Sequence, residues 1–205
     1  MPDAHHDLHG AAPDRSTMAL LVIDMISEFA FEGGDELLRS AGAVAPRILA
    51  LKRRAAAAGV PTIYVNDNGG RWRSDFGGLL RRCARRGKPG AAIARLLRPS
   101  PEDYRVLKPK HSGFFATALD TLLQYLGART LVLTGATSHQ CVLFTANDAY
   151  VRDLRLVIPR DCLAARRPAD TALALRYFRA VLDADVGDSC RVQFTPGSRG
   201  PRRPA

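Results

Sequence analysis

The stretch LTGATSHQCVLFTANDA, Leu133–Ala149, decides the fold class. Its apolar run ends at Gly135, and six residues later Cys141 opens a segment with the composition of a helix. A buried strand that turns directly into a helix is the repeating unit of parallel α/β sheets. The thiol of Cys141 is therefore expected at a strand-to-helix junction.

The rest of the chain repeats this alternation of short apolar runs and longer alanine- and leucine-rich segments. Five runs have the length and composition of buried strands: ALLVID (19–24), PTIYVN (61–66), YRVLK (104–108), TLVLTG (130–135) and LRLVIP (154–159). The predicted helices are 43–59, 90–97, 115–127, 140–153 and 168–184, and DVGDS (185–189) is a candidate sixth strand. Strands that are apolar throughout need cover on both faces. The sequence thus predicts a three-layer α/β/α sandwich around a mostly parallel sheet of about six strands.

Length and composition favour one compact domain over residues 18–190, between flexible tails at 1–17 and 191–205. The chain has 205 residues, of which 46% are hydrophobic, enough for a full core. The net charge is +10, and two basic segments, 81–88 and 198–205, carry five and three of those charges. Because the charge is concentrated in these two segments, we interpret it as solvated surface and expect no nucleic-acid partner.

The cysteines and the hydropathy set the expected environment. Four cysteines lie far apart with no CxxC spacing, which argues against a zinc knuckle or a disulfide framework. No apolar run approaches the roughly 20 residues of a membrane span, and the N-terminal segment has no signal-peptide core. We expect a reduced, cytoplasmic protein without a membrane partner.

Three chemically distinct side chains stand at the carboxyl ends of predicted strands, where parallel sheets gather their ligands. The first strand ends in Asp24, the third in Lys108, and Cys141 follows the fourth. A helix N-terminus and a nearby ammonium are both expected to stabilise a thiolate. A carboxylate within reach could take the thiol proton and return it to a leaving amine. Taken singly, each residue is more simply a core or surface residue, but together they indicate a nucleophilic hydrolase.

Four segments closely resemble the isochorismatase-like cysteine hydrolases, a group that includes nicotinamidases, N-carbamoylsarcosine amidases and ureidoacrylate amidohydrolases. They are LLVIDM (20–25), VLKPKHSGF (106–114), LTGATSHQCVLFTANDAY (133–150) and VIPRDCLAA (157–165), and the resemblance spans about residues 18–188. It implies an amidohydrolase that cleaves an amide or ureido C–N bond of a small molecule through a thioester. It also implies a homo-oligomer, either a dimer or a tetramer.

The resemblance assigns roles to particular residues. Asp24 matches the general base and acid, Lys108 the catalytic lysine, and Cys141 the nucleophile, whereas Lys110 matches a basic position that is not catalytic. It further implies a cis peptide bond between Ala136 and Thr137. The N–H groups of Thr137 and Cys141 would then form the oxyanion hole.

Departures from the family pattern bear on metal and substrate. Ile26 stands where the family often has glutamine, and no histidine occurs between His9 and His111. A nicotinamidase-type metal site is therefore not expected, and we predict no metal and no cofactor. Phe29 and Trp72 are candidates to line the substrate pocket, and core or lid packing explains Trp72 equally well.

Two other functions compete with a hydrolase. TGATSHQ, with Tyr104 and Lys108 as a nominal YxxxK, suggests an NADPH-dependent short-chain reductase. However, His139 and Cys141 stand where glycines must admit a pyrophosphate, and strand residues four apart are separated by about 13 Å. The other alternative is a catalytically inactive family member that acts as a binding protein, against which the intact Asp24, Lys108 and Cys141 argue.

Overall fold

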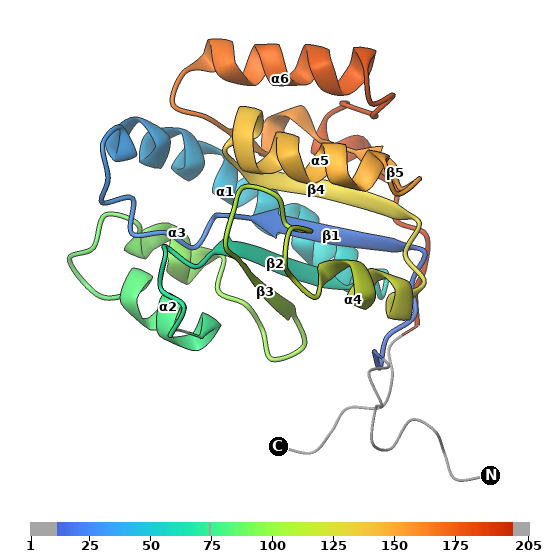
Figure 1. Ribbon diagram of the computed structural model, residues 1–205, viewed down its shortest axis with the longest axis horizontal. Coiled ribbons are helices and arrows are strands. Elements are labelled where there is room, and N and C mark those ends of the chain that lie inside the picture. The colour runs from blue at the N-terminus through green and yellow to red at the C-terminus, as the bar shows by residue number, and fades with distance from the viewer. Residues whose placement is uncertain (1–11, 74, 199–205) are drawn as a thin grey trace, which may run out of the picture.

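A parallel sheet forms the middle layer of the computed structural model, which describes residues 12–73 and 75–198 (Figure 1). In this part of the chain six strands pair in the order β3-β2-β1-β4-β5, with β6 also on β4, and every pair is parallel. The strands are β1 (Met18–Ile23), β2 (Thr62–Asp67), β3 (Tyr104–Lys108), β4 (Thr130–Ala136), β5 (Arg155–Val157) and β6 (Leu163–Ala164). The predicted fold class is confirmed.

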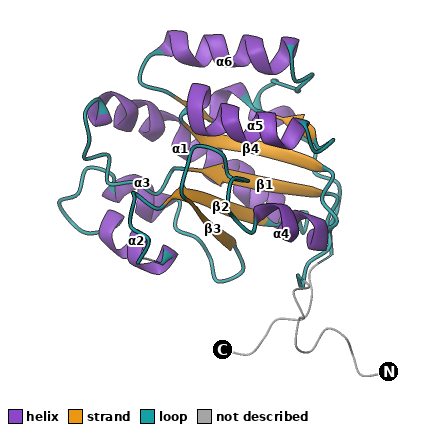
Figure 2. Cartoon of the chain, viewed as in Figure 1, coloured by secondary structure: helices purple, strands orange, loops and turns teal. Residues whose placement is uncertain are grey.

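Helices cover both faces of this sheet (Figure 2). The α-helices are α1 (Gly34–Ala57), α2 (Phe76–Cys83), α3 (Ala91–Leu96), α4 (Leu119–Leu126), α5 (Leu143–Tyr150) and α6 (Pro168–Ala180). Three shorter helical turns are η1 (Ser138–Val142, a π-helix), η2 (Arg160–Cys162) and η3 (Ser189–Arg191). None of the helices described is long and apolar enough to cross a membrane.

Alternation along the central strand β1 divides the core in two. Leu20 and Val22 pack into one apolar cluster with α1, α2 and α3, and Leu21 and Ile23 into a second with α4, α5 and α6. Successive strand side chains point to opposite faces, so a run that is apolar throughout supplies both clusters. All six residues of β1 are buried.

Two element predictions are wrong in position. Residues 185–189 form no strand, since only an isolated parallel bridge joins Asp185 to Val157. The sixth strand is instead Leu163–Ala164, which is too short to be recognised from its composition. In addition, α1 begins at Gly34, well before the predicted start at residue 43.

The packed region extends beyond the predicted boundaries at residues 18 and 190. Val192 is 7% exposed and belongs to the cluster under α1, and its carbonyl accepts a hydrogen bond from Arg54. At the other end, Arg15 and Ser198 pair as an antiparallel bridge. The Pro/Gly/Arg composition of 191–205 is typical of a tail, although the first half of this segment contains apolar residues that pack against the core. The remainder of each predicted tail, 1–11 and 199–205, lies outside the described residues.

Candidate active site

Asp24, Lys108 and Cys141 come together at the carboxyl edge of the sheet. Lys108 Nζ lies 2.7 Å from Asp24 Oδ2 and donates a hydrogen bond of 3.4 Å to Cys141 Sγ. The Lys108 side chain is completely buried, and that of Asp24 is 15% exposed. Three residues far apart in sequence thus form one contiguous group of a carboxylate, an ammonium and a thiol.

The chain leaves β1 through a conformation that turns Asp24 into the site. Its φ is +51°, a left-handed value that is uncommon for a residue other than glycine, while its N–H still donates to the Val65 carbonyl. The Asp67 N–H donates to Asp24 Oδ1 at 2.6 Å, so both carboxylate oxygens are engaged. The Asp24 carboxylate is therefore held from two sides before any substrate arrives.

A tight connection from β4 presents Cys141. Gly135 has φ +113°, and a Cβ there would lie 2.0 Å from the Ile23 carbonyl oxygen, so only glycine allows β1 and β4 this close. The Ala136–Thr137 peptide bond is cis. η1 follows at once, with the N–H groups of Gln140 and Val142 donating to the Thr137 carbonyl. Cys141 thus lies in a single π-helical turn, a feature often found at functional sites.

The charges of the site are strongly coupled. Burial acts to lower the pKa of Lys108, but the neighbouring Asp24, Cys141 and Asp67 raise it above its ordinary value. Burial raises the pKa of Asp24, and the Lys108 charge and the hydrogen bonds to the carboxylate only partly offset that effect. At neutral pH the ammonium is therefore charged, and Asp24 is a stronger base than an exposed aspartate.

The expectation of a stabilised thiolate is wrong for the resting site. Burial, and then the Asp24 carboxylate, raise the pKa of Cys141 to about 12, against the lowering effect of Lys108. The Asp24 carboxylate is, after burial, the largest cause of the raised pKa of the thiol. Cys141 is therefore a neutral thiol beside a base.

His111, within VLKPKHSGF, is a site residue that the sequence pattern did not predict. Its Nδ1 lies 3.7 Å from Cys141 Sγ, and its ring packs against Phe144 with centroids 5.3 Å apart. Asp67 also approaches, with Oδ2 3.7 Å from Lys108 Nζ. The available signal was proximity along the chain, because His111 follows Lys108 by three residues.

The two predicted pocket residues differ in environment. Phe29 is 2% exposed and packs in the core beneath α1, whereas Trp72 is 78% exposed on the loop after β2. Their role in a substrate pocket stays a prediction. Among the residues described, no group of three or more His, Cys, Asp and Glu side chains is placed to hold a metal ion.

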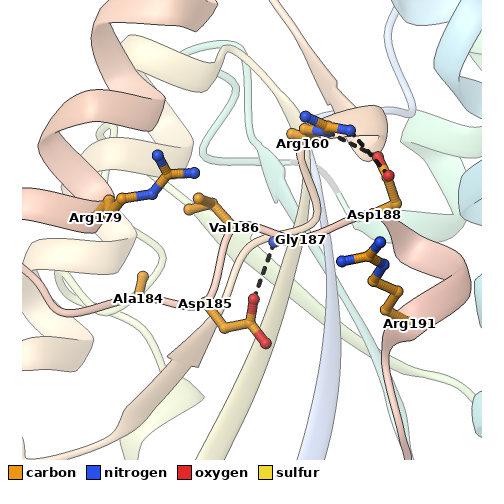
Figure 3. Close-up of a pocket in the computed structure, with 8 residues that line it drawn as sticks. All are labelled: Arg160, Arg179, Ala184, Asp185, Val186, Gly187, Asp188 and Arg191. Carbon is orange, nitrogen blue, oxygen red and sulfur yellow. Dashed lines mark hydrogen bonds and ion pairs between the residues drawn. The ribbon is translucent and has the colours of Figure 1, made fainter.

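A cavity of about 380 Å³ lies apart from this site, beside β5 (Figure 3). Among the residues that line it, Arg160 donates two hydrogen bonds to the Asp188 carboxylate, and the Gly187 N–H donates to Asp185. The guanidinium groups of Arg179 and Arg191 flank the same space (Figure 3). The residues that line it include none of the three catalytic candidates.

The geometry removes the support for the reductase alternative. The Tyr104 hydroxyl donates to Asp14 at the amino end of β3, while Lys108 contacts Asp24 at the carboxyl end. The two residues of the nominal YxxxK therefore lie at opposite ends of β3 and cannot act on one substrate.

The fold and the site define a class: three-layer α/β proteins with a carboxylate, a lysine and a cysteine at the carboxyl edge of a parallel sheet. Residues 18–188 match the isochorismatase domain. The chain is 39% identical over 172 residues to YaaI, an isochorismatase family protein of Bacillus subtilis (strain 168), covering 84% of this chain and 94% of YaaI. The protein belongs to the isochorismatase family.

Two further relatives carry names that describe an activity. The ureidoacrylate amidohydrolase RutB of Methylorubrum extorquens is 32% identical over 176 residues, covering 72% of this chain and 70% of RutB. The crystal structure of N-carbamoylsarcosine amidase from Thermoplasma acidophilum superposes with a TM-score of 0.66 and 29% identity. That match covers 86% of this chain and 99% of the amidase.

Proposed function

We propose that this protein is a cysteine amidohydrolase that cleaves an amide or ureido C–N bond of a small molecule through a thioester at Cys141. One observation carries the proposal: a fully buried ammonium, Lys108 Nζ, lies 2.7 Å from the Asp24 carboxylate and 3.4 Å from the Cys141 sulfur. A nucleophile, a base and a fixed positive charge in mutual contact are the components that acyl transfer needs.

In the first step Asp24 takes the proton of Cys141 as the sulfur attacks the substrate carbon. The raised pKa of the carboxyl makes Asp24 a competent base, and the positive charge of Lys108 remains beside the thiolate as it forms. The carbonyl oxygen becomes an oxyanion. We propose the backbone N–H groups of Thr137 and Cys141 as its donors, since both flank the turn that carries the thiol.

The second step expels the amine. Protonated Asp24 delivers its proton to the departing nitrogen, the C–N bond breaks, and the acyl group stays on Cys141 as a thioester. Asp24, again a carboxylate, then takes a proton from water, whose oxygen attacks the thioester. The acid leaves, the proton returns to the sulfur, and the site is restored with Lys108 charged throughout.

The substrate class rests on the relatives. The names of RutB and of the Thermoplasma enzyme describe hydrolysis of ureido or N-carbamoyl compounds. We therefore place small ureido acids first among the candidates and simple amides second. The assignment of Phe29 and Trp72 to the pocket is part of this proposal.

Ammonia release from a panel of small amides and ureido acids tests the function, with Cys141→Ala as the control. Intact mass spectrometry after acid quenching should show a covalent adduct on the wild type, with an added mass equal to that of the substrate minus that of the leaving amine. The adduct should be absent from Cys141→Ala. Undiminished turnover by Cys141→Ala would refute the mechanism.

A further inference from the structure

His111 contacts the reacting sulfur. Its Nδ1 lies 3.7 Å from Cys141 Sγ, within the longer range of hydrogen bonds to sulfur, and the imidazole is exposed. We propose that His111 is a fourth catalytic residue, whose Nδ1–H donates a hydrogen bond to the Cys141 sulfur and stabilises the thiolate as it forms. The inference rests on the proposed function of this same site.

The hydrogen-bond count at the sulfur gives the direction of this contact. A thiol has one proton, and in the proposed mechanism Asp24 takes that proton. Lys108 already donates to the sulfur at 3.4 Å. Because Sγ has no second proton to give, Nδ1 can contribute only by donating. When Asp24 removes the proton, the sulfur becomes negative and its bonds to Lys108 and His111 both strengthen.

The loop after β3 holds the imidazole in place. Lys108 Nζ donates to the Lys110 carbonyl at 3.2 Å, so the catalytic ammonium also fixes the residue before His111. Beyond it, the Gly113 N–H donates to Thr145 Oγ1 on α5 at 3.0 Å. The ring packs on Phe144, about one turn after Cys141. The loop that carries the histidine therefore contacts α5, which directly continues the η1 turn of the nucleophile.

Two substitutions separate a hydrogen-bond role from a packing role. His111→Phe keeps an aromatic ring against Phe144 but has no donor. His111→Asn removes the ring but places an amide N–H near the position of Nδ1. Lys110→Met is the matched control, since it changes an exposed side chain on the same loop. His111→Ala replaces the phenylalanine variant if that variant fails to fold.

The readout is the rate at which iodoacetamide alkylates Cys141 at neutral pH, followed by peptide mass spectrometry. The exposed Cys190 of the same molecule is the internal reference. We expect alkylation of Cys141 to slow about tenfold or more in His111→Phe, the loss expected for one hydrogen bond to a charged group, and to recover to within about threefold of wild type in His111→Asn. Lys110→Met should match the wild type. In hydrolysis His111→Phe should lower kcat and leave KM nearly unchanged, because the hydrogen bond from His111 to the sulfur strengthens only as the thiolate charge develops.

Alkylation needs no amide substrate, so the two proposals can fail separately. An unchanged Cys141 rate in His111→Phe would overturn the role of His111 whether or not an amide is hydrolysed. Equal slowing in His111→Phe and His111→Asn would also overturn it, since only the ring would then matter. If no amide is turned over but the asparagine variant still restores alkylation, the hydrogen bond stands and the proposed hydrolase function fails.

Discussion

Replacing Lys108 by methionine should cost the protein both its activity and much of its stability. The side chain is fully buried, and its ammonium lies 2.7 Å from the Asp24 carboxylate. Methionine has a similar length and no charge. The substitution therefore removes the only cation beside the buried Asp24 carboxylate in the described site. The Asp67 N–H and the neutral Cys141 thiol remain as its neighbours. Removing one partner of a buried ion pair typically costs about 3–5 kcal/mol.

For a chain of this length that loss corresponds to a fall in Tm of roughly 6–20 °C. Urea titration gives the free energy of unfolding directly. Lys110→Met, an exposed lysine two residues away, is the control and should change the unfolding free energy by less than about 0.5 kcal/mol. The double variant Asp24→Asn/Lys108→Met removes both charges of the pair and should recover most of the stability of the single variant but none of the activity.

The loss should depend on pH in a defined direction. Burial raises the pKa of Asp24 in the native state, and removing the Lys108 charge raises it further. In the unfolded chain the same carboxyl titrates near its ordinary value of about 3.9. Between those two pKa values the native variant binds more protons, so its unfolding free energy falls as pH rises. The gap to wild type should therefore widen from acid to neutral pH.

Either of two results would refute this reasoning. One is a Lys108→Met protein as stable as Lys110→Met at neutral pH. The other is a double variant no more stable than the single one, which would mean that lost packing rather than the unpaired carboxylate causes the destabilisation.

Three further predictions address the chemistry and the domain boundary. Cys141→Ser and Asp24→Asn should each lose nearly all turnover in the ammonia assay, and the double variant should lose about as much as either alone, since the residues act as a unit; additive losses would contradict this. Asp24 must be ionised to act and its pKa is raised, so kcat/KM should begin to fall at a pH above the ordinary aspartate range as the pH is lowered. The raised pKa values of Lys108 and Cys141 should keep kcat/KM level toward alkaline pH. A fall that begins only below about pH 4 would count against Asp24 as the base. Truncation after Cys190 removes the buried Val192 and should lower the free energy of unfolding in urea by about 2–4 kcal/mol. An unchanged urea midpoint would show that this segment does not contribute to stability.

The sequence predicted the parts of the fold whose residues are buried on both faces. The runs that became β1, β2 and β4 are buried almost throughout, as a doubly covered parallel strand requires, whereas only two residues of the edge strand β3 are buried. The two-residue strand Leu163–Ala164 has no such signature, because it exists only through pairing with Gly135 and Ala136. Likewise, the early start of α1 depends on Gly33 in a left-handed conformation, which composition does not specify. Tertiary pairing, and not local propensity, decides such short elements.

The candidate site was predictable for a related reason. Asp24, Lys108 and Cys141 each end or follow an apolar run, and a parallel sheet brings the ends of its strands to one edge. His111 belongs to no strand and approaches the sulfur only because the loop after β3 folds back onto α5. The direction of the Cys141 pKa shift was equally inaccessible. It depends on how deeply the sulfur is buried and on which oxygen faces it, and neither quantity can be read from spacing.

That pKa determines how the nucleophile is activated. A cysteine ionised in advance would need the surrounding positive charge to outweigh burial, and here burial and Asp24 together raise the pKa of Cys141 to about 12. The thiolate must then form during the attack, by proton transfer to Asp24, and the positive charge of Lys108 must serve first the carboxylate and then the sulfur. Lys108 lies between the two, 2.7 Å from one and 3.4 Å from the other, so the shift of negative charge requires no movement of the lysine. A site arranged before the reaction avoids the cost of reorganising around a charge that exists only briefly. The fully buried lysine, more than the thiol, is therefore the residue around which this edge of the sheet is organised.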